Sequence, residues 1–110
     1  MSPPGPPRGM LAEFSITPIG KGTSVSKYVA RCLDLVDRSG LDYRLNPMGT
    51  VVEGPFDEVF ALIARCHKAV ARDCARVSTI IKIDDRKGAR GQLEAKVRRV
   101  EAALGRRLRA

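Results

Sequence analysis

Two segments of this chain place hydroxyl, amide and carboxylate side chains next to turn-forming residues. Ser15 and Thr17 alternate with apolar residues and are followed by a turn rich in proline and glycine. Asn46 and Thr50 lie on either side of a second turn, and Glu53 follows on the strand that this turn opens. Polar groups of these kinds on a small sheet can hydrogen-bond a small polar ligand or a partner subunit. The spacing alone leaves both alternatives open.

Each of these residues also has a plainer explanation. Asparagine and threonine at turns often satisfy nearby backbone groups, and a surface glutamate can be solvated or paired with a cation. Alternation along a strand sends Ser15, Thr17 and Glu53 to the same outward face. It sends Thr50 to the opposite face unless a bulge intervenes, which weakens Thr50 as a partner of Glu53.

The sequence predicts neither a metal site nor an enzyme. Three cysteines without regular spacing argue against a disulfide scaffold and fit a reducing cytoplasm. Cys32 and Cys66 fall on apolar helical stripes, where we expect them to be buried as small hydrophobic residues. His67 is the one histidine. No serine or aspartate is placed to complete a triad with it, and the cysteines lack the spacing of metal ligands, so we expect a packed side chain.

Length and charge limit the class of protein. The chain has 110 residues, which suits one domain, and it has no apolar run long enough to span a membrane. Residues 1–85 carry 11 Lys/Arg and 10 Asp/Glu, a net charge of +1, whereas residues 86–110 carry 9 and 2, a net charge of +7. The basic character therefore belongs to the tail and predicts a solvated helix there. Residues 1–9 include four prolines, lack the regions of an export signal and predict a disordered leader.

Hydrophobic periodicity predicts an α+β domain over residues 10–110. Strands are expected at 10–19, 41–46, 50–53 and 77–83, and helices at 25–39, 55–70 and 92–108, with a charged loop at 84–91. This order is the ferredoxin-like βαββαβ pattern with an extra C-terminal helix. Right-handed crossovers put the first and third strands at the centre of a four-stranded antiparallel sheet. The two main helices then cover one face, and the other face stays open to solvent, a ligand or a second copy.

Four segments in the expected order give the chain a family resemblance. They read "FSITPIGKGTSVSKYV", "GLDYRLNPMGTVVEG", "DEVFALIARCHKAV" and "RVSTIIKIDDR". Over about residues 10–87 the chain resembles the small thiamine-binding-protein family. The resemblance implies a ferredoxin-like fold, assembly into homodimers and often homotetramers, and binding of thiamine (vitamin B1) or its pyrimidine portion, without an established enzyme activity. The proline-rich leader and the basic C-terminal helix are expected to depart from the compact family pattern.

The resemblance gives the five polar residues expected roles in ligand binding. Glu53 is the first candidate, because a carboxylate can pair with a protonated aminopyrimidine and such charge-assisted hydrogen bonds are strong. Thr50 and Asn46 would supply neutral hydrogen bonds to the pyrimidine edge. Ser15 and Thr17 would line the same pocket or meet a partner sheet. Thiamine is expected as a ligand, and no resident cofactor is expected.

Two other classes of binding module share this strand order. An amino-acid-sensing module similar to ACT domains is the main alternative, because the glycines at 20 and 22 loosely match the turn of such modules. An RNA-recognition domain needs aromatic side chains on the open sheet face for base stacking. The three phenylalanines and two tyrosines all fall on helix-facing positions or helical stripes, so the sequence predicts no nucleic-acid partner.

Overall fold

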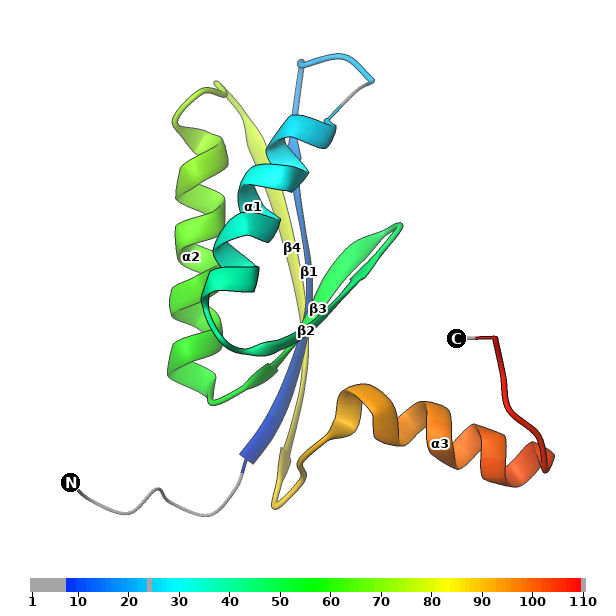
Figure 1. Ribbon diagram of the computed structural model, residues 1–110. Helices are drawn as coiled ribbons and strands as arrows, with labels where there is room; N and C mark the ends of the chain where they lie inside the picture. The colour runs from blue at the N-terminus through cyan, green and yellow to red at the C-terminus, as the bar shows by residue number, and fades with distance from the viewer. Residues whose placement is uncertain (1–7, 24, 110) are drawn as a thin grey trace.

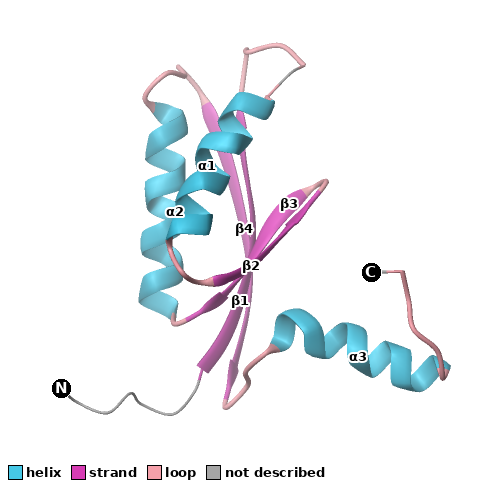
Figure 2. Cartoon of the chain, in the orientation of Figure 1, coloured by secondary structure: helices cyan, strands magenta, loops and turns pink. Residues whose placement is uncertain are grey.

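The computed structural model describes residues 8–23 and 25–109, and their elements form a sheet with helices on both sides (Figures 1 and 2). In chain order the elements are β1 (Arg8–Pro18), α1 (Ser26–Arg38), β2 (Asp42–Asn46), β3 (Gly49–Gly54), α2 (Phe56–Ala71), β4 (Val77–Lys87) and α3 (Gln92–Leu104). The ferredoxin-like order predicted from the sequence is confirmed, and so is the additional helix at the C-terminal end.

The four strands form one antiparallel sheet in the order β2-β3-β1-β4, with β3 and β1 at the centre as predicted. β1 pairs with β4 from Arg8↔Lys87 to Pro18↔Val77. Its pairing with β3 is much shorter and ends at Phe14↔Thr50. One edge of β1 therefore has no strand partner beyond Phe14, and this difference creates the site described below.

The core lies between the sheet and the helices α1 and α2, which cover one face (Figure 1). Alternate residues of β1 point into it, and the apolar stripes of both helices close over them. The buried members are Met10, Ala12, Phe14, Tyr28, Cys32, Val36, Val52, Val59, Leu62, Ile63, Cys66 and Val70. Burying one large aliphatic side chain contributes about 1.5–3 kcal/mol, so this cluster fixes where the helices sit on the sheet.

Three boundaries differ clearly from the sequence-based expectation, and one of them is the end of α3, which lies at Leu104 and not at residue 108. β1 begins at Arg8, so Arg8 and Gly9 belong to the sheet, whereas residues 1–7 of the expected leader lie outside the described residues. β4 continues to Lys87, so the segment 84–87 is strand and the expectation of a charged loop there is wrong. The reason is that the early start of β1 supplies backbone partners for this segment, while its side chains remain exposed and need no apolar surroundings.

Helix α3 leaves the end of β4 and projects away from the sheet on the side opposite α1 and α2 (Figure 2). None of its residues is buried, although its first turns contact the sheet. Val100 and Leu104 on its apolar stripe are about half exposed, at 48% and 51%. In the described part of the chain, no helix combines the length and apolar character that crossing a membrane requires.

Candidate functional site

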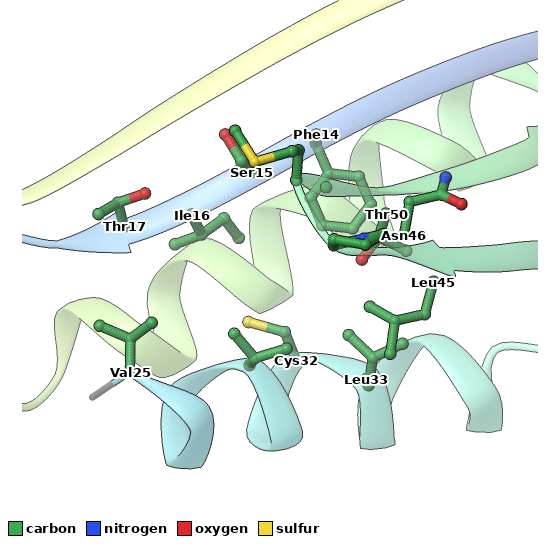
Figure 3. Close-up of a pocket in the computed structure, with 14 residues that line it drawn as sticks. Phe14, Ser15, Ile16, Thr17, Val25, Cys32, Leu33, Leu45, Asn46 and Thr50 are labelled. Atoms are coloured by element: carbon green, nitrogen blue, oxygen red, sulfur yellow. The ribbon is translucent and has the colours of Figure 1, made fainter. Parts of the chain in front are cut away.

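A hollow of about 180 Å³ lies where β1 and the β2–β3 hairpin part (Figure 3). Because β3 pairs with β1 only as far as Phe14, the segment 15–18 and the hairpin turn 46–49 enclose a space that α1 closes from below. The lining residues are Phe14, Ser15, Ile16, Thr17, Val25, Val29, Cys32, Leu33, Leu45, Asn46, Pro47, Met48, Gly49 and Thr50. Most of them are apolar, so the hollow favours a ligand with an apolar or aromatic body.

The helix side of this hollow is formed by side chains from three elements. Ile16 of β1 and Leu45 of β2 point towards α1, and Cys32 and Leu33 of α1 point back at them (Figure 3). Leu45 is 55% exposed and Met48, in the hairpin turn, is 90% exposed. The outer rim is therefore apolar and open, which leaves room for part of a ligand to extend out of the hollow or for a second protein surface to cover it.

Thr50 brings a hydroxyl group into this apolar space. It is 5% exposed and lies in register with Phe14 and Leu45, so its side chain shares their helix-facing side. Within the described residues its hydroxyl makes no hydrogen bond, and no fully buried side-chain oxygen or nitrogen lacks a partner there. The Thr50 oxygen must therefore open onto the hollow, where it can donate or accept one hydrogen bond. Alternation along β3 puts Thr50 on the opposite face from Glu53, as the sequence predicted, and this places Thr50 at the hollow.

Ser15, Thr17 and Asn46 border the hollow from the gap between the strands. Alternation puts their side chains on the face away from α1, and Figure 3 shows Thr17 and Asn46 pointing in that direction. The structure therefore brings four of the five predicted residues to one hollow, but only Thr50 directs its side chain into the helix side. The other three place polar groups beside the hollow, on the face of the sheet away from α1.

The backbone of Ile16 adds a feature that the sequence analysis missed. The N–H of Ile19 donates to the carbonyl of Arg76, the residue before β4, at 2.8 Å. The backbone N–H and C=O of Ile19 therefore point towards the β4 side of the chain. In antiparallel pairing such residues alternate, and the N–H and C=O of Ile16 therefore face the β3 side. Because β3 pairing ends at Phe14, this donor and acceptor lie at the free edge beside the hollow. Detecting them requires the strand register, which composition and spacing do not reveal.

Glu53 lies away from the hollow, at the other end of β3. Its side chain is buried, at 7% exposure, and its carboxylate accepts the N–H of Gln92 at 2.9 Å and the N–H of Leu93 at 3.3 Å. These are the first free amides of α3, whose own N-cap residue, Gly91, offers no side chain. A carboxylate at a helix N-terminus is favoured by both hydrogen bonding and the helix dipole. Glu53 does not line the hollow, and it anchors α3 to the sheet.

A second depression, of about 290 Å³, lies between the open sheet face and α3. The residues that line it include both acidic and basic side chains. They are Leu11, Glu13, Arg44, Asn46, Val51, Lys82, Ile83, Asp84, Gln92, Leu93 and Lys96. Lys96 of α3 reaches Asp84 of β4 at 3.4 Å. The start of α3 thus covers one end of the face that the sequence analysis left entirely open, and Asn46 borders both depressions.

His67 joins α2 to β4. Its Nδ1 lies 2.6 Å from the hydroxyl oxygen of Thr79, and the side chain is half-buried. This agrees with the expectation of a packed histidine that is satisfied locally. In the described residues, no group of three or more His, Cys, Asp or Glu side chains could hold a metal ion.

Comparison with known proteins assigns this chain to a family. The model of a family described as thiamine-binding protein matches residues 12–101. The chain belongs to this family. All residues that line the hollow fall within the match. The match also extends through most of α3, so the expectation that the C-terminal helix departs from the family pattern is wrong for residues 92–101. The match therefore continues beyond residue 87, where the expected resemblance ended.

Individual relatives support the same conclusion. UPF0045 protein MJ1052 of Methanocaldococcus jannaschii is 40% identical over 93 residues, which is 84% of this chain and 93% of that protein. A crystal structure of MJ1052 has a TM-score of 0.75 at 39% identity and covers 88% of this chain and 96% of the other. A Thermotoga maritima structure, named as a candidate thiamine biosynthesis or salvage protein, shares the fold with a TM-score of 0.74 at 20% identity, covering 86% and 99%.

Proposed function

We propose that this chain is a non-catalytic binding protein for thiamine or a related pyrimidine, that it works as a homo-oligomer, and that the pyrimidine ring occupies the hollow beside β1. The observation that carries this proposal is the apolar hollow into which the Thr50 hydroxyl opens, without a hydrogen bond among the described residues, beside an edge of β1 that β3 does not pair. The family match and the name of the Thermotoga maritima neighbour support the choice of ligand.

The size of the hollow favours one ring rather than the whole vitamin. An engineered protein cavity of about 150 Å³ holds a benzene molecule, so the space of about 180 Å³ suits a single substituted ring. Thiamine has a second ring, a thiazolium, which carries a positive charge. Transferring a charge into apolar surroundings is strongly unfavourable. We therefore place the thiazolium outside the hollow, past the exposed Met48 side chain, where water or a second subunit can reach it.

The polar groups of the hollow match the edge of an aminopyrimidine. Its amine donates a hydrogen bond and the adjacent ring nitrogen accepts one, while the carbonyl and N–H of Ile16 offer the complementary pair along the free edge of β1. Thr50 can bond a further ring nitrogen, and Ser15, Thr17 and Asn46 can hold a ligand substituent or a bound water at the rim. In this proposal Glu53 acts by anchoring α3, and the ligand contact that the sequence analysis expected of Glu53 is tested with the Glu53→Ala variant.

Assembly of several copies would cover apolar surface that one copy leaves bare. The exposed residues include Ile80 of β4 at 67%, together with Val100 and Leu104 of α3. β4 is also an edge strand, and such edges are usually covered or paired. We propose a homodimer or a homotetramer. The three free cysteines favour a reducing compartment such as the cytoplasm.

Calorimetric titration with separate fragments tests the ligand. We expect thiamine and its free aminopyrimidine alcohol to bind, and the thiazole alcohol alone to give no heat of binding, because only the pyrimidine ring enters the hollow. A panel of amino acids serves as the comparison. Binding of an amino acid with no response to either pyrimidine compound would contradict the proposal and favour an amino-acid-sensing module. Sedimentation of the full chain with and without ligand measures the assembly.

A further inference from the structure

Cys32 and Cys66 face each other where α1 and α2 cross beneath the sheet. The sulfur of Cys32 lies 3.7 Å from the carbonyl oxygen of Cys66, and the sulfur of Cys66 lies 3.6 Å from the carbonyl oxygen of Cys32. Both thiols are free and buried, with side chains exposed by 5% and 0%. Each sulfur thus reaches past the other side chain to the opposing backbone. The small cysteine side chains allow this close approach, and it leaves the two side chains next to each other between the helices.

The two thiols differ in their readiness to ionise. The hydrogen bond from the Cys66 thiol lowers the pKa of Cys32, and this outweighs burial, which raises it, while the Arg31 guanidinium lowers it further. The pKa of Cys66 is raised, chiefly because its proton is held in the hydrogen bond with Cys32, and also by burial. The thiolate is the reactive form of cysteine. Ionisation is therefore favoured at Cys32, the one of the two cysteines that also lines the hollow.

Only Cys32 has a path to a small reagent. It lines the hollow beside β1, whereas Cys66 lies fully buried behind it. The third cysteine, Cys74, follows α2 and packs half-buried against the edge of the core. It has no hydrogen bond to either of the other two within the described residues. A reagent that enters the hollow would therefore meet Cys32 first, with Cys66 as the adjacent sulfur.

We propose that Cys32 and Cys66 are a site of reversible covalent modification, at which a small hydroperoxide that enters the hollow converts the two thiols to a disulfide. In the first step the Cys32 sulfur attacks one peroxide oxygen. An S–O bond forms, the O–O bond breaks, and the other oxygen leaves with the thiol proton as water or alcohol. In the second step the Cys66 sulfur attacks the Cys32 sulfenic acid. An S–S bond forms, the S–O bond breaks, and hydroxide leaves with the Cys66 proton as water.

The electrons balance over the two steps, because the peroxide is reduced by two electrons and the pair of thiols is oxidised by two. The product ties α1 to α2 through Cys32, which lines the hollow. A ligand in the hollow would block the path of the peroxide to Cys32. This last point rests on the proposed function, whereas formation of the disulfide does not.

The disulfide is tested on the full, reduced chain without any ligand. The protein is treated with dilute hydrogen peroxide, and its peptides are separated without reductant and identified by mass spectrometry. We expect a peptide pair joined through Cys32 and Cys66, lighter by two hydrogens and separated again by dithiothreitol. The Cys74→Ala variant should give the same product at the same rate. A link that involves Cys74, a link only between chains, or unmodified Cys32 would overturn the inference.

A second variant separates the two steps. In Cys66→Ala the attacking sulfur remains and its partner is gone, so Cys32 should stop at the sulfenic acid and be captured by dimedone. The melting transition of this variant, measured by circular dichroism, checks that it is folded. Should it fail to fold, dimedone capture in the intact chain at short times gives the same information. Absence of any capture at Cys32 in both experiments contradicts the mechanism.

Protection by ligand is measured separately with thiamine as the probe. At about ten times its dissociation constant, the ligand leaves about one tenth of the sites free, and the oxidation rate should fall about tenfold. An unchanged rate with bound thiamine would place the ligand away from Cys32 and contradict the blocked path. If calorimetry shows no binding, the proposed function fails while the disulfide result stands by itself.

Discussion

The two ends of β3 use polar residues in opposite ways. Thr50 at one end is almost fully buried, yet its hydroxyl has no hydrogen bond in the described residues and opens onto the hollow. Glu53 at the other end is equally buried, and both of its oxygens are occupied by amides of α3. The difference arises because other parts of the chain provide hydrogen-bond partners at the Glu53 end and not at the Thr50 end. α3 reaches Glu53 and closes that end, whereas β3 stops short of the free edge of β1 and leaves the other end open.

This comparison teaches that a buried polar group is a binding candidate only when the fold leaves it unsatisfied. Unpaired buried polar groups are costly, so an open one is retained only where solvent or a ligand can reach it. The closed end should therefore respond to mutation with a loss of stability, and the open end with a loss of ligand affinity. The predictions below test this division.

Glu53→Ala should have the largest effect on stability. The change removes the acceptors of two α3 amides and leaves a void beside the connector between β4 and α3. Each buried group left unsatisfied costs about 1–3 kcal/mol, so we expect a loss of about 3 kcal/mol in the free energy of unfolding. Urea denaturation followed by circular dichroism measures it. The control is Glu94→Ala, because Glu94 is exposed and, among the described residues, bonds only Arg98 on the same helix.

The same variant decides whether Glu53 also contacts the ligand. Under conditions where Glu53→Ala is still folded, calorimetry should give a thiamine affinity close to that of the unchanged protein. A loss of binding in the folded variant would show that the carboxylate touches the ligand, and the division between the two ends of β3 would then fail.

Gly9→Ala should be the next most damaging change, also at the closed end. A Cβ atom at this position would clash with the backbone oxygen of Ala89 and would lie 2.9 Å from the Glu53 carboxylate. Overpacking of this kind typically costs about 1–3 kcal/mol, and backbone atoms cannot turn aside. Gly49→Ala at the hollow is the matched comparison, since its nearest contact would be 3.2 Å. The melting temperature should fall more for Gly9→Ala than for Gly49→Ala. A larger fall for Gly49→Ala would contradict the close packing at Gly9.

Much of this architecture could be predicted from the sequence. Alternation in β1 and the stripes of α1 and α2 gave the element order and the central strands, because hydrophobic periodicity is a local signal. The length of β4 could not be predicted, since its charged end is stabilised by pairing with residues 8–11 and not by its own composition. For the same reason the hydrogen bonds between Glu53 and α3 could not be predicted. The amides of Gln92 and Leu93 lie far from Glu53 in the sequence, and an amide carries no residue-specific signal.

Thr50→Val should lower ligand affinity with little change in stability. Valine keeps the shape of threonine and removes the hydroxyl, so a ligand loses one neutral hydrogen bond worth about 0.5–1.5 kcal/mol. This corresponds to a dissociation constant about 2–13 times higher. Calorimetry with the aminopyrimidine alcohol measures it, and Thr23→Val, an exposed position outside the hollow, is the control. Equal affinities in the two variants would remove the Thr50 hydroxyl from the site.

Asp37→Asn should have the smallest effect of these changes. Asp37 of α1 accepts a hydrogen bond from Tyr43 of β2 at 2.9 Å. This bond to a carboxylate raises the pKa of Tyr43, because it favours the neutral phenol. A raised pKa means that the bond stabilises the fold below the ordinary value of about 10 and that this contribution is lost as the pH rises through the raised value. Ultraviolet titration of Asp37→Asn should show Tyr43 ionising at lower pH than in the unchanged protein, with thiamine affinity at neutral pH unaffected. A change in affinity would mean that the tie between β2 and α1 also sets the shape of the hollow, so that the open end depends on contacts outside its own lining.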